Sequence, residues 1–135
     1  MTKETLCTYE QSSRLKRLGF DWPCWSVYHE QVNGSILLER SKTQADNWNA
    51  GIYISAPTRE TAHRWLIEKE NLFIAFTPQK DDNGRRIYSF NIYWLESLEI
   101  VDKSEKLYDT YGKAMSDALD KAIICASFIN HNNKI

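Results

Sequence analysis

The groups in this sequence that could do nucleophilic or metal chemistry are three cysteines and three histidines, spread along the chain. Cys24 and His29 are five positions apart, so on one strand their side chains would face opposite sides of a sheet. Glu60 and His63 have the i, i+3 spacing of di-iron helices, but such sites need a second motif of this kind and further glutamates. Zinc sites favour Cys-X-X-Cys pairs, and the sequence contains none. We therefore expect no metal site.

The sequence marks out no catalytic nucleophile. It contains no Gly-X-Ser-X-Gly motif, and its five glycines are all isolated, so no glycine-rich loop is available to hold a phosphate. A small enzyme with a cysteine–histidine site is the third hypothesis, with Cys24 between Pro23 and Trp25 as one candidate. Buried cysteines that act as small hydrophobic residues are the simpler interpretation. We assign no catalytic residue, no cofactor and no small-molecule ligand.

Aromatic side chains on one predicted strand offer a different chemistry, the stacking of nucleic-acid bases. Tyr93 would lie on the outer face of this strand, and Arg86 at the end of it, close to Arg85 and Lys80. The opposite face carries a row that is typical of a core: Tyr88, Phe90, Ile92 and Trp94. Seventeen basic residues face eighteen acidic ones, so the chain lacks the basic excess of nucleic-acid-binding proteins. Nucleic-acid binding is therefore the second hypothesis.

A polar stretch, residues 41–51, contains one isolated tryptophan, Trp48, between Asn47 and Asn49. Trp48 either packs over the core or serves as an exposed anchor, because tryptophan is usually buried but is also enriched at interface hot spots. Long loops inside compact domains are often functional. If the protein works by binding, we expect Trp48, Asn47 and Asn49 to contact the partner.

Three segments with helical periodicity must position these groups: residues 3–18, 58–71 and 111–130. Cys7 shares the apolar face of the first, and Gly19 can end it by adopting a positive φ. Thr58 and Thr110 are the expected N-caps of the other two. The predicted buried face of the second helix consists of Ala62, Trp65 and Leu66.

Alternating residues predict two hairpins and a short strand between them. The first hairpin turns at Asn33-Gly34, where the Asn-Gly pair favours a type I′ turn, and the second turns at Asp81–Gly84. The short strand covers residues 51–55. The fold class is therefore α+β, with an antiparallel sheet from two hairpins plus a short strand, and with three helices. The element order is helix, hairpin, strand, helix, hairpin, helix.

A length of 135 residues, with 42% hydrophobic and 26% charged residues, is typical of one globular domain. We expect a single domain over residues 1–135, with a loosely packed N-terminal helix in 1–19 and a frayed tail at 130–135. Residues 24–70 and 72–130 both run from a hairpin to a helix, and the sequence leaves open whether they are a duplication.

The compartment is predicted to be the cytoplasm. Three well-separated cysteines do not form a disulfide framework, and the start of the chain lacks the apolar core of a signal peptide. No stretch approaches the length of apolar residues that a membrane span needs, so no membrane association is expected.

One part of the chain resembles small uncharacterised proteins of Bacteroides-type bacteria, which are often encoded among phage-like or mobile-element genes. The resemblance covers about residues 50–125 and depends on Tyr53–Thr58, Ala62, Trp65-Leu66 and Asp109–Tyr111. It implies a bacterial cytoplasmic setting and an accessory role, and it implies no reaction. Together with the missing catalytic motifs, it makes a non-enzymatic accessory domain that binds another protein, or a second copy of itself, the leading hypothesis.

Overall fold

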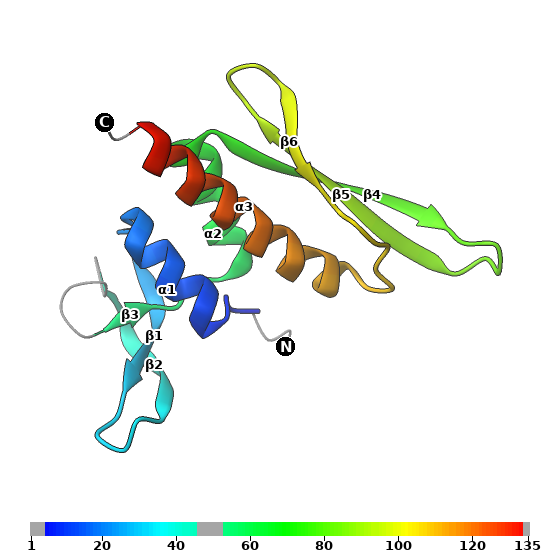
Figure 1. The fold of residues 1–135 in the computed structure, drawn as a ribbon. Coiled ribbons are helices and arrows are strands. Elements are labelled where there is room, and N and C mark those ends of the chain that lie inside the picture. Colours follow the sequence, from blue (N-terminus) through cyan, green and yellow to red (C-terminus); the bar gives the residue numbers. More distant parts are fainter. Residues whose placement is uncertain (1–4, 46–52, 134–135) are drawn as a thin grey trace. The chain divides into compact units, whose positions relative to one another are not determined.

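The computed structural model describes residues 5–45 and 53–133, and their elements are labelled in Figure 1. Residues Met1–Ala62 form one compact unit and residues His63–Ile135 form a second. The elements are α1 (Tyr9–Leu18), β1 (Cys24–Glu30), β2 (Ile36–Ala45), β3 (Ile54–Ser55), α2 (Arg59–Glu70), β4 (Leu72–Lys80), β5 (Arg86–Trp94), β6 (Glu99–Lys103) and α3 (Tyr111–Asn133).

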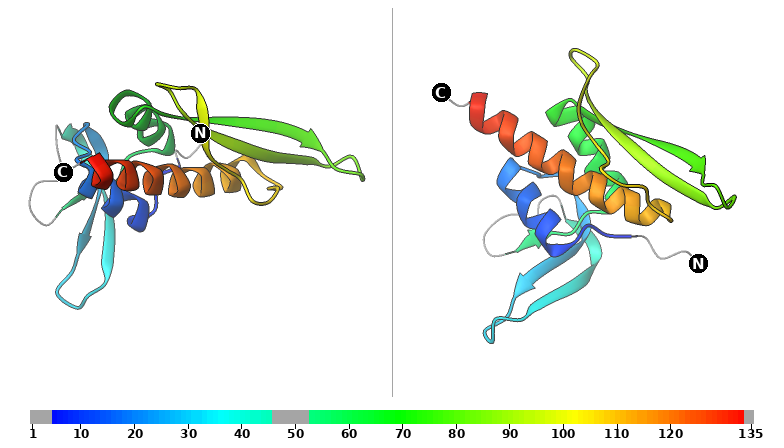
Figure 2. Two further views of the ribbon diagram at one scale, coloured as in Figure 1. Left: turned by 45° about the horizontal axis from the view of Figure 1, so that its top comes forward. Right: turned by 45° about the vertical axis from the view of Figure 1, so that its right-hand side comes forward.

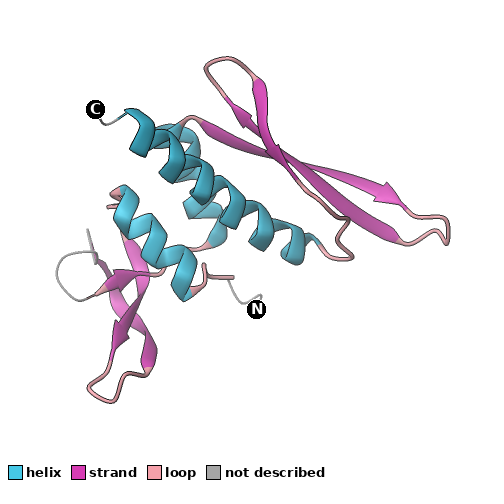
Figure 3. Ribbon diagram, viewed as in Figure 1, coloured by secondary structure: helices cyan, strands magenta, loops and turns pink. Residues whose placement is uncertain are grey.

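The α+β class and the predicted order of elements are confirmed (Figure 3). The structure adds one strand, β6, and it divides the strands between two antiparallel sheets, with orders β2-β1-β3 and β4-β5-β6. The single domain expected from the sequence stays a prediction. Among the described helices, none is both long enough and apolar enough to cross a membrane.

Helix α1 begins at Tyr9, six residues later than predicted. A capping box fixes this start, since Thr8 Oγ1 accepts a hydrogen bond from the Gln11 amide at 3.1 Å and Gln11 Oε1 accepts one from the Thr8 amide at 2.9 Å. The prediction that Cys7 lies on this helix was wrong, because the Cys7 amide instead donates to the Pro57 carbonyl at 2.9 Å. Gly19 ends the helix with a φ of 97°, as expected.

The turn of the first hairpin is not the predicted type I′ turn. Gly34 has a φ of 86°, but Asn33 is not among the residues with positive φ. The Gly34 amide donates to the Gln31 carbonyl at 2.9 Å, and the Gln31 amide donates to the Ser35 carbonyl at 2.8 Å. This is a three-residue loop that ends in a glycine bulge, the next most common hairpin geometry. Asn33 uses its side chain instead, and accepts a hydrogen bond from the Ser35 amide at 3.1 Å.

Strand β2 is longer than predicted, because its backbone stays in the sheet as far as Ala45. Residues 41–45 were expected in a loop, and that expectation was wrong. Pairing with β1 continues past an irregularity, so that Ser26 lies opposite Arg40 and Cys24 lies opposite Ala45. Asn47, Trp48 and Asn49 lie outside the described residues, so their predicted role stays a prediction.

Helix α2 begins as predicted, after Thr58, whose Oγ1 accepts a hydrogen bond from the Thr61 amide at 3.1 Å. It ends where Asn71 adopts a φ of 57°. The expected inner face is confirmed, since Ala62, Trp65 and Leu66 are all buried.

In the second unit, β4 and β5 form a long hairpin (Figure 2) that pairs from Leu72 opposite Trp94 to Lys80 opposite Arg86. Its turn repeats the geometry of the first, with a φ of 78° at Gly84. The strand orders differ, however. In the first sheet the central strand is β1, the first strand of its hairpin. In the second sheet the central strand is β5, the second strand of its hairpin. The two hairpin-to-helix segments therefore do not share one topology.

Helix α3 contacts all three strands of the second sheet. Its amphipathic spacing predicts this, and the expected inner residues Met115, Leu119 and Ala122 are buried. On the sheet, Phe90 and Ile92 are buried, while Tyr88 and Trp94 are half-buried. Thr110 Oγ1 accepts a hydrogen bond from the Lys113 amide at 3.2 Å, which confirms the predicted cap. The helix continues to Asn133, three residues beyond its predicted end.

Candidate functional site

Tyr93 and Arg86, the two described residues of the expected interaction site, do not form one surface. Both lie on β5, where Tyr93 pairs with Phe73 and Arg86 pairs with Lys80 at the opposite end of the hairpin. Seven residues separate them along the strand, which corresponds to about 23 Å and places their side chains on opposite faces. A base stacked on Tyr93 would therefore be far from the charge of Arg86.

The two histidines whose side chains the structure describes, His29 and His63, have partners that explain them without catalysis. His29 Nε2 lies 3.0 Å from Glu39 Oε1, and its ring contacts Tyr53 edge to face. His63 Nε2 accepts a hydrogen bond from the Ile74 amide at 3.0 Å, and burial lowers the pKa of this imidazole. In the part of the chain that the structure describes, neither histidine contacts a cysteine.

The thiol of Cys24 is in an environment that opposes nucleophilic chemistry. Burial raises the pKa of Cys24 to about 11, against a smaller opposing effect of a hydrogen bond with Ser55. Its Sγ also lies 3.6 Å from the Trp22 carbonyl oxygen. Because the thiolate is the reactive form, a thiol with this pKa is a poor nucleophile at neutral pH. Burial likewise raises the pKa of Cys125.

The described residues contain no group of three or more histidine, cysteine, aspartate or glutamate side chains that could hold a metal ion. His63 is half-buried, and its Nε2 atom accepts the hydrogen bond of the Ile74 amide, so this nitrogen is not available as a metal ligand beside Glu60.

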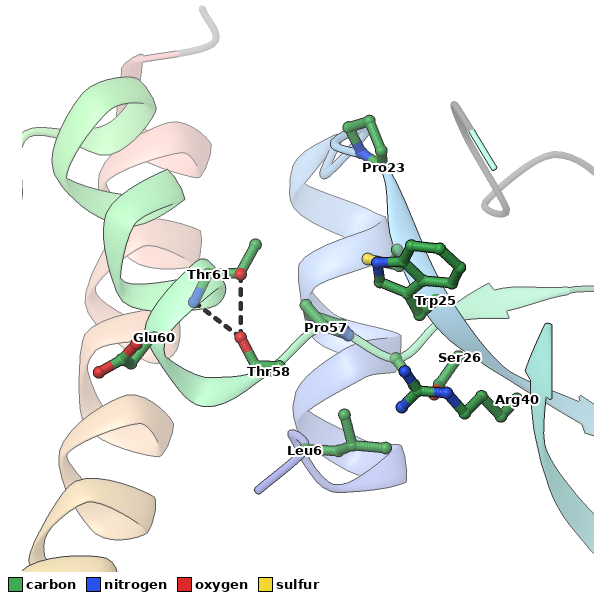
Figure 4. Close-up of a pocket in the computed structure, with 11 residues that line it drawn as sticks. Leu6, Pro23, Trp25, Ser26, Arg40, Pro57, Thr58, Glu60 and Thr61 are labelled. Atoms are coloured by element: carbon green, nitrogen blue, oxygen red, sulfur yellow. Dashed lines mark hydrogen bonds between the residues drawn. The ribbon is translucent and has the colours of Figure 1, made fainter. Parts of the chain in front are cut away.

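A pocket of about 270 Å³ lies in the first unit, between the sheet and the start of α2 (Figure 4). Strand β1 supplies one wall and β2 contributes a single residue, Arg40. The connection from β3 into α2 supplies the other wall, and the Ala56 amide joins the two walls by donating to the Ser26 carbonyl at 2.9 Å.

Three consecutive residues of β1 line this pocket: Cys24, Trp25 and Ser26. They keep the alternation of a strand, since Cys24 and Ser26 are buried and Trp25 is exposed. The irregularity lies in the partner strand, because Cys24 lies opposite Ala45 and Ser26 lies opposite Arg40, so the extra residues of this bulge belong to β2.

Arg40 and Trp25 form the charged corner of the pocket. The guanidinium of Arg40 lies 5.8 Å from the centre of the Trp25 ring, within the range of a cation–π contact. Trp25 is 42% exposed, so the ring also offers apolar surface to a ligand. No carboxylate among the described residues forms an ion pair with Arg40. The corner thus carries a positive charge that the described chain does not neutralise.

Polar side chains complete the lining. Ser26 also lines the pocket and is 5% exposed. Thr58 and Thr61 are already engaged, because the Thr58 hydroxyl donates to Thr61 Oγ1 at 2.9 Å while it caps α2. Glu60 also lines the pocket, and in Figure 4 its carboxylate points away from Trp25 and Arg40.

The sequence analysis did not find this pocket. Trp25 was assigned to an alternating strand, Arg40 had no motif around it, and Ser26 carried no signal at all. The only hint was the clustering of Pro23, Cys24 and Trp25, which was weighed as a thiol site. A bulge between two strands has no signature in a single sequence, so the convergence of these residues could not be predicted.

The second unit has a different kind of depression, of about 300 Å³, between α3 and strands β5 and β6. Its lining is apolar apart from the Cys125 thiol and comprises Trp94, Val101, Ile124, Cys125, Phe128 and Ile129. None of these residues is charged, so the Arg40 pocket, which has a guanidinium to orient a ligand, is the better candidate for specific recognition.

Comparison of this chain with protein-family models, with curated proteins and with solved structures finds no match.

Proposed function

We propose that this protein is a non-enzymatic accessory domain that works by binding another protein, and that the pocket beside Arg40 receives an acidic side chain of that partner. The observation that carries the proposal is the guanidinium of Arg40, which lies over Trp25 and has no carboxylate partner among the described residues. A cation that is held in place, and that no described carboxylate pairs with, is available to an anion from outside.

A carboxylate is the anion that fits this corner. A guanidinium presents a planar fork of N–H donors that can bind both oxygens of a carboxylate. Stacking on Trp25 restricts the motion of Arg40, so less conformational entropy is lost when the anion binds. Ser26, on the wall of the same pocket, adds a hydroxyl that can donate a further hydrogen bond.

The size of the pocket favours a side chain over a free metabolite. Its volume of about 270 Å³ is below the roughly 300–1,000 Å³ of pockets that enclose drug-sized ligands. Arginine and tryptophan are also the residue types that most often carry the binding energy of protein interfaces. A glutamate or aspartate that projects from a protein partner would use both features.

Binding is favoured over catalysis by the state of the reactive groups. Cys24 lines the pocket, but burial raises its pKa far above neutrality. His29 and His63 are engaged by Glu39 and by the Ile74 amide. Among the described residues that line the pocket there is no histidine, and the carboxylate of Glu60 points away from Trp25 and Arg40 (Figure 4).

The proposal can be tested with a pair of blocked tripeptides, acetyl-Gly-Glu-Gly-amide and its glutamine counterpart. The readout is the NMR signal of the Trp25 indole N–H, which is assigned by its disappearance in Trp25→Phe. We expect the glutamate peptide to shift this signal with a Kd on the order of millimolar, as is usual for a single anchoring contact, and the glutamine peptide to leave it unchanged.

Variants locate the effect. Arg40→Gln should abolish the shift and Arg40→Lys should weaken it, because lysine lacks the planar fork. Arg85→Gln is the matched control, since it removes the same charge from an exposed position on the other hairpin, and it should bind as the wild type does. Equal shifts with both peptides, or equal losses in the two glutamine variants, would contradict the proposal.

An oligothymidylate tests the nucleic-acid hypothesis with the same readout. If it shifts the Trp25 signal more strongly than the glutamate peptide does, nucleic-acid binding replaces the proposed protein partner.

A further inference from the structure

Strand β2 has one hydrogen-bonding edge that no described strand of the first sheet uses, because the strand order is β2-β1-β3. The Ser26 carbonyl accepts from Ala56, so the even-numbered residues of β1 direct their backbone groups toward β3. Tyr28 is one of them, and it lies opposite Leu38. Because the backbone groups of Tyr28 point toward β3, Tyr28 and Leu38 form a pair without hydrogen bonds between them. The N–H and C=O of Leu38 therefore point away from β1, toward the outer edge of β2. The same holds for Ile36, opposite Glu30.

The side chains along this edge are apolar. Ile36, Leu37 and Leu38 are 40%, 36% and 46% exposed. Proteins usually protect a free edge with charges, proline or a covering element, and an exposed hydrophobic edge is a template for pairing. The two outer edges of the second sheet differ, since His63 binds an amide of β4, and three of the five residues of β6 are charged: Glu99, Asp102 and Lys103.

We propose that two copies of this chain pair through β2, in antiparallel orientation, about a two-fold axis at Leu37. Leu37 then lies opposite Leu37 of the second copy, and Ile36 lies opposite Leu38 of the second copy on both sides of the axis. The outward backbone groups of Ile36 and Leu38 form four hydrogen bonds across the axis. Two three-stranded sheets thus become one continuous sheet, and the contact is isologous, as two-fold symmetry requires.

The residues that would lie opposite each other favour this register over two alternatives. Parallel pairing in register would place Glu39 opposite Glu39 and Arg40 opposite Arg40, which is destabilising. An antiparallel axis at Leu38 would place Ile36 opposite Arg40. With the axis at Leu37, Glu39 lies opposite Ser35 and Arg40 lies opposite Gly34, so no like charges oppose each other and the apolar residues meet only apolar residues.

The contact is small, so the dimer is weak. Five residues of one strand make the pairing, which is at the low end of specific interfaces. We expect a dissociation constant between roughly 10 µM and 1 mM, measured by sedimentation equilibrium over that concentration range.

Disulfide trapping tests the register. Residues opposite each other in a pair that is not hydrogen-bonded have Cα atoms about 4.5 Å apart, within the range of a disulfide. Leu37→Cys should therefore form a disulfide-linked dimer under mild oxidation, with the 37–37 bond identified by mass spectrometry. Glu39→Cys is the matched control, because its two copies would lie about 13 Å apart along the strands and should not crosslink. No crosslink in Leu37→Cys, or equal crosslinking of both variants, would overturn the proposal.

Proline scanning tests the edge itself. Leu38→Ala and Leu38→Pro remove the same side chain, but only proline also removes the outward N–H, which β1 does not use. We expect Leu38→Pro to dimerise at least ten-fold more weakly than Leu38→Ala, with an unchanged circular dichroism spectrum. Equal dimerisation of the two folded variants would show that the edge does not pair.

This inference is independent of the Arg40 pocket. Arg40 lies opposite the glycine of the second copy in the proposed register, so Arg40→Gln should leave the dimerisation constant unchanged within two-fold. A monomeric wild type at 1 mM would overturn the dimer and leave the pocket proposal intact. Loss of dimerisation in Arg40→Gln would overturn the register.

Discussion

His63 Nε2 accepts a hydrogen bond from the amide of Ile74 at 3.0 Å, and this bond ties helix α2 to the edge strand β4. The imidazole is neutral with its proton on Nδ1, because Nε2 acts as the acceptor. Phe73 packs against the same ring, with the ring centres 5.7 Å apart. The contact protects an edge amide that would otherwise be available to another strand, whereas no described side chain protects the outer edge of β2 in this way.

The stability of the protein should depend on the protonation of His63. Burial holds the pKa of this imidazole below its ordinary value of about 6.5, so the unfolded chain binds the proton more readily than the folded chain does. The stabilisation is therefore complete above pH 6.5 and is lost as the pH falls below that value.

His63→Gln keeps a hydrogen-bond acceptor for the Ile74 amide but cannot titrate. We expect the free energy of unfolding, measured by urea titration, to fall more between pH 7.5 and pH 5 in the wild type than in this variant. Parallel curves for the two proteins would show that His63 does not contribute to the pH dependence.

Cys24 should react slowly with thiol reagents. With the pKa raised to about 11, the thiolate population at pH 8 is about 100-fold smaller than in the unfolded chain, whose cysteines titrate near 9. Iodoacetamide labelling, followed site by site by mass spectrometry, should show at least this difference between the native protein and the protein in guanidinium. A native Cys24 that labels as fast as the unfolded one would revive the cysteine–histidine hypothesis.

Leu119 should be essential to the second unit. It is fully buried on α3, the helix that covers the second sheet, so Leu119→Ala should destabilise the protein by about 2–5 kcal/mol, as other buried leucine truncations do. Ile124 lies on the same helix and is 52% exposed, so Ile124→Ala should cost only about 0.5 kcal/mol. A denaturant titration that gives equal losses for both variants would be inconsistent with the packing of α3.

The sequence by itself determined the features that depend on a few neighbouring residues. Thr58 and Thr110 cap helices because a side-chain oxygen reaches an amide three residues later, and Gly19 ends one because it tolerates a positive φ. Local rules also have limits, since the Asn33-Gly34 pair is compatible with two turn geometries and the structure adopts the other one.

Only the tertiary structure decided which distant residues meet. The division of the strands between two sheets, the extension of β2 to Ala45 and the bulge in β2 after Arg40 depend on pairing across the chain. The pairing of β1 with β2 brings Ser26 and Trp25 to one pocket with Arg40, fifteen residues from Trp25 in sequence. Strand pairing is set by the sum of many weak contacts and not by a local preference, so the spacing of residues in the sequence could not predict the pocket.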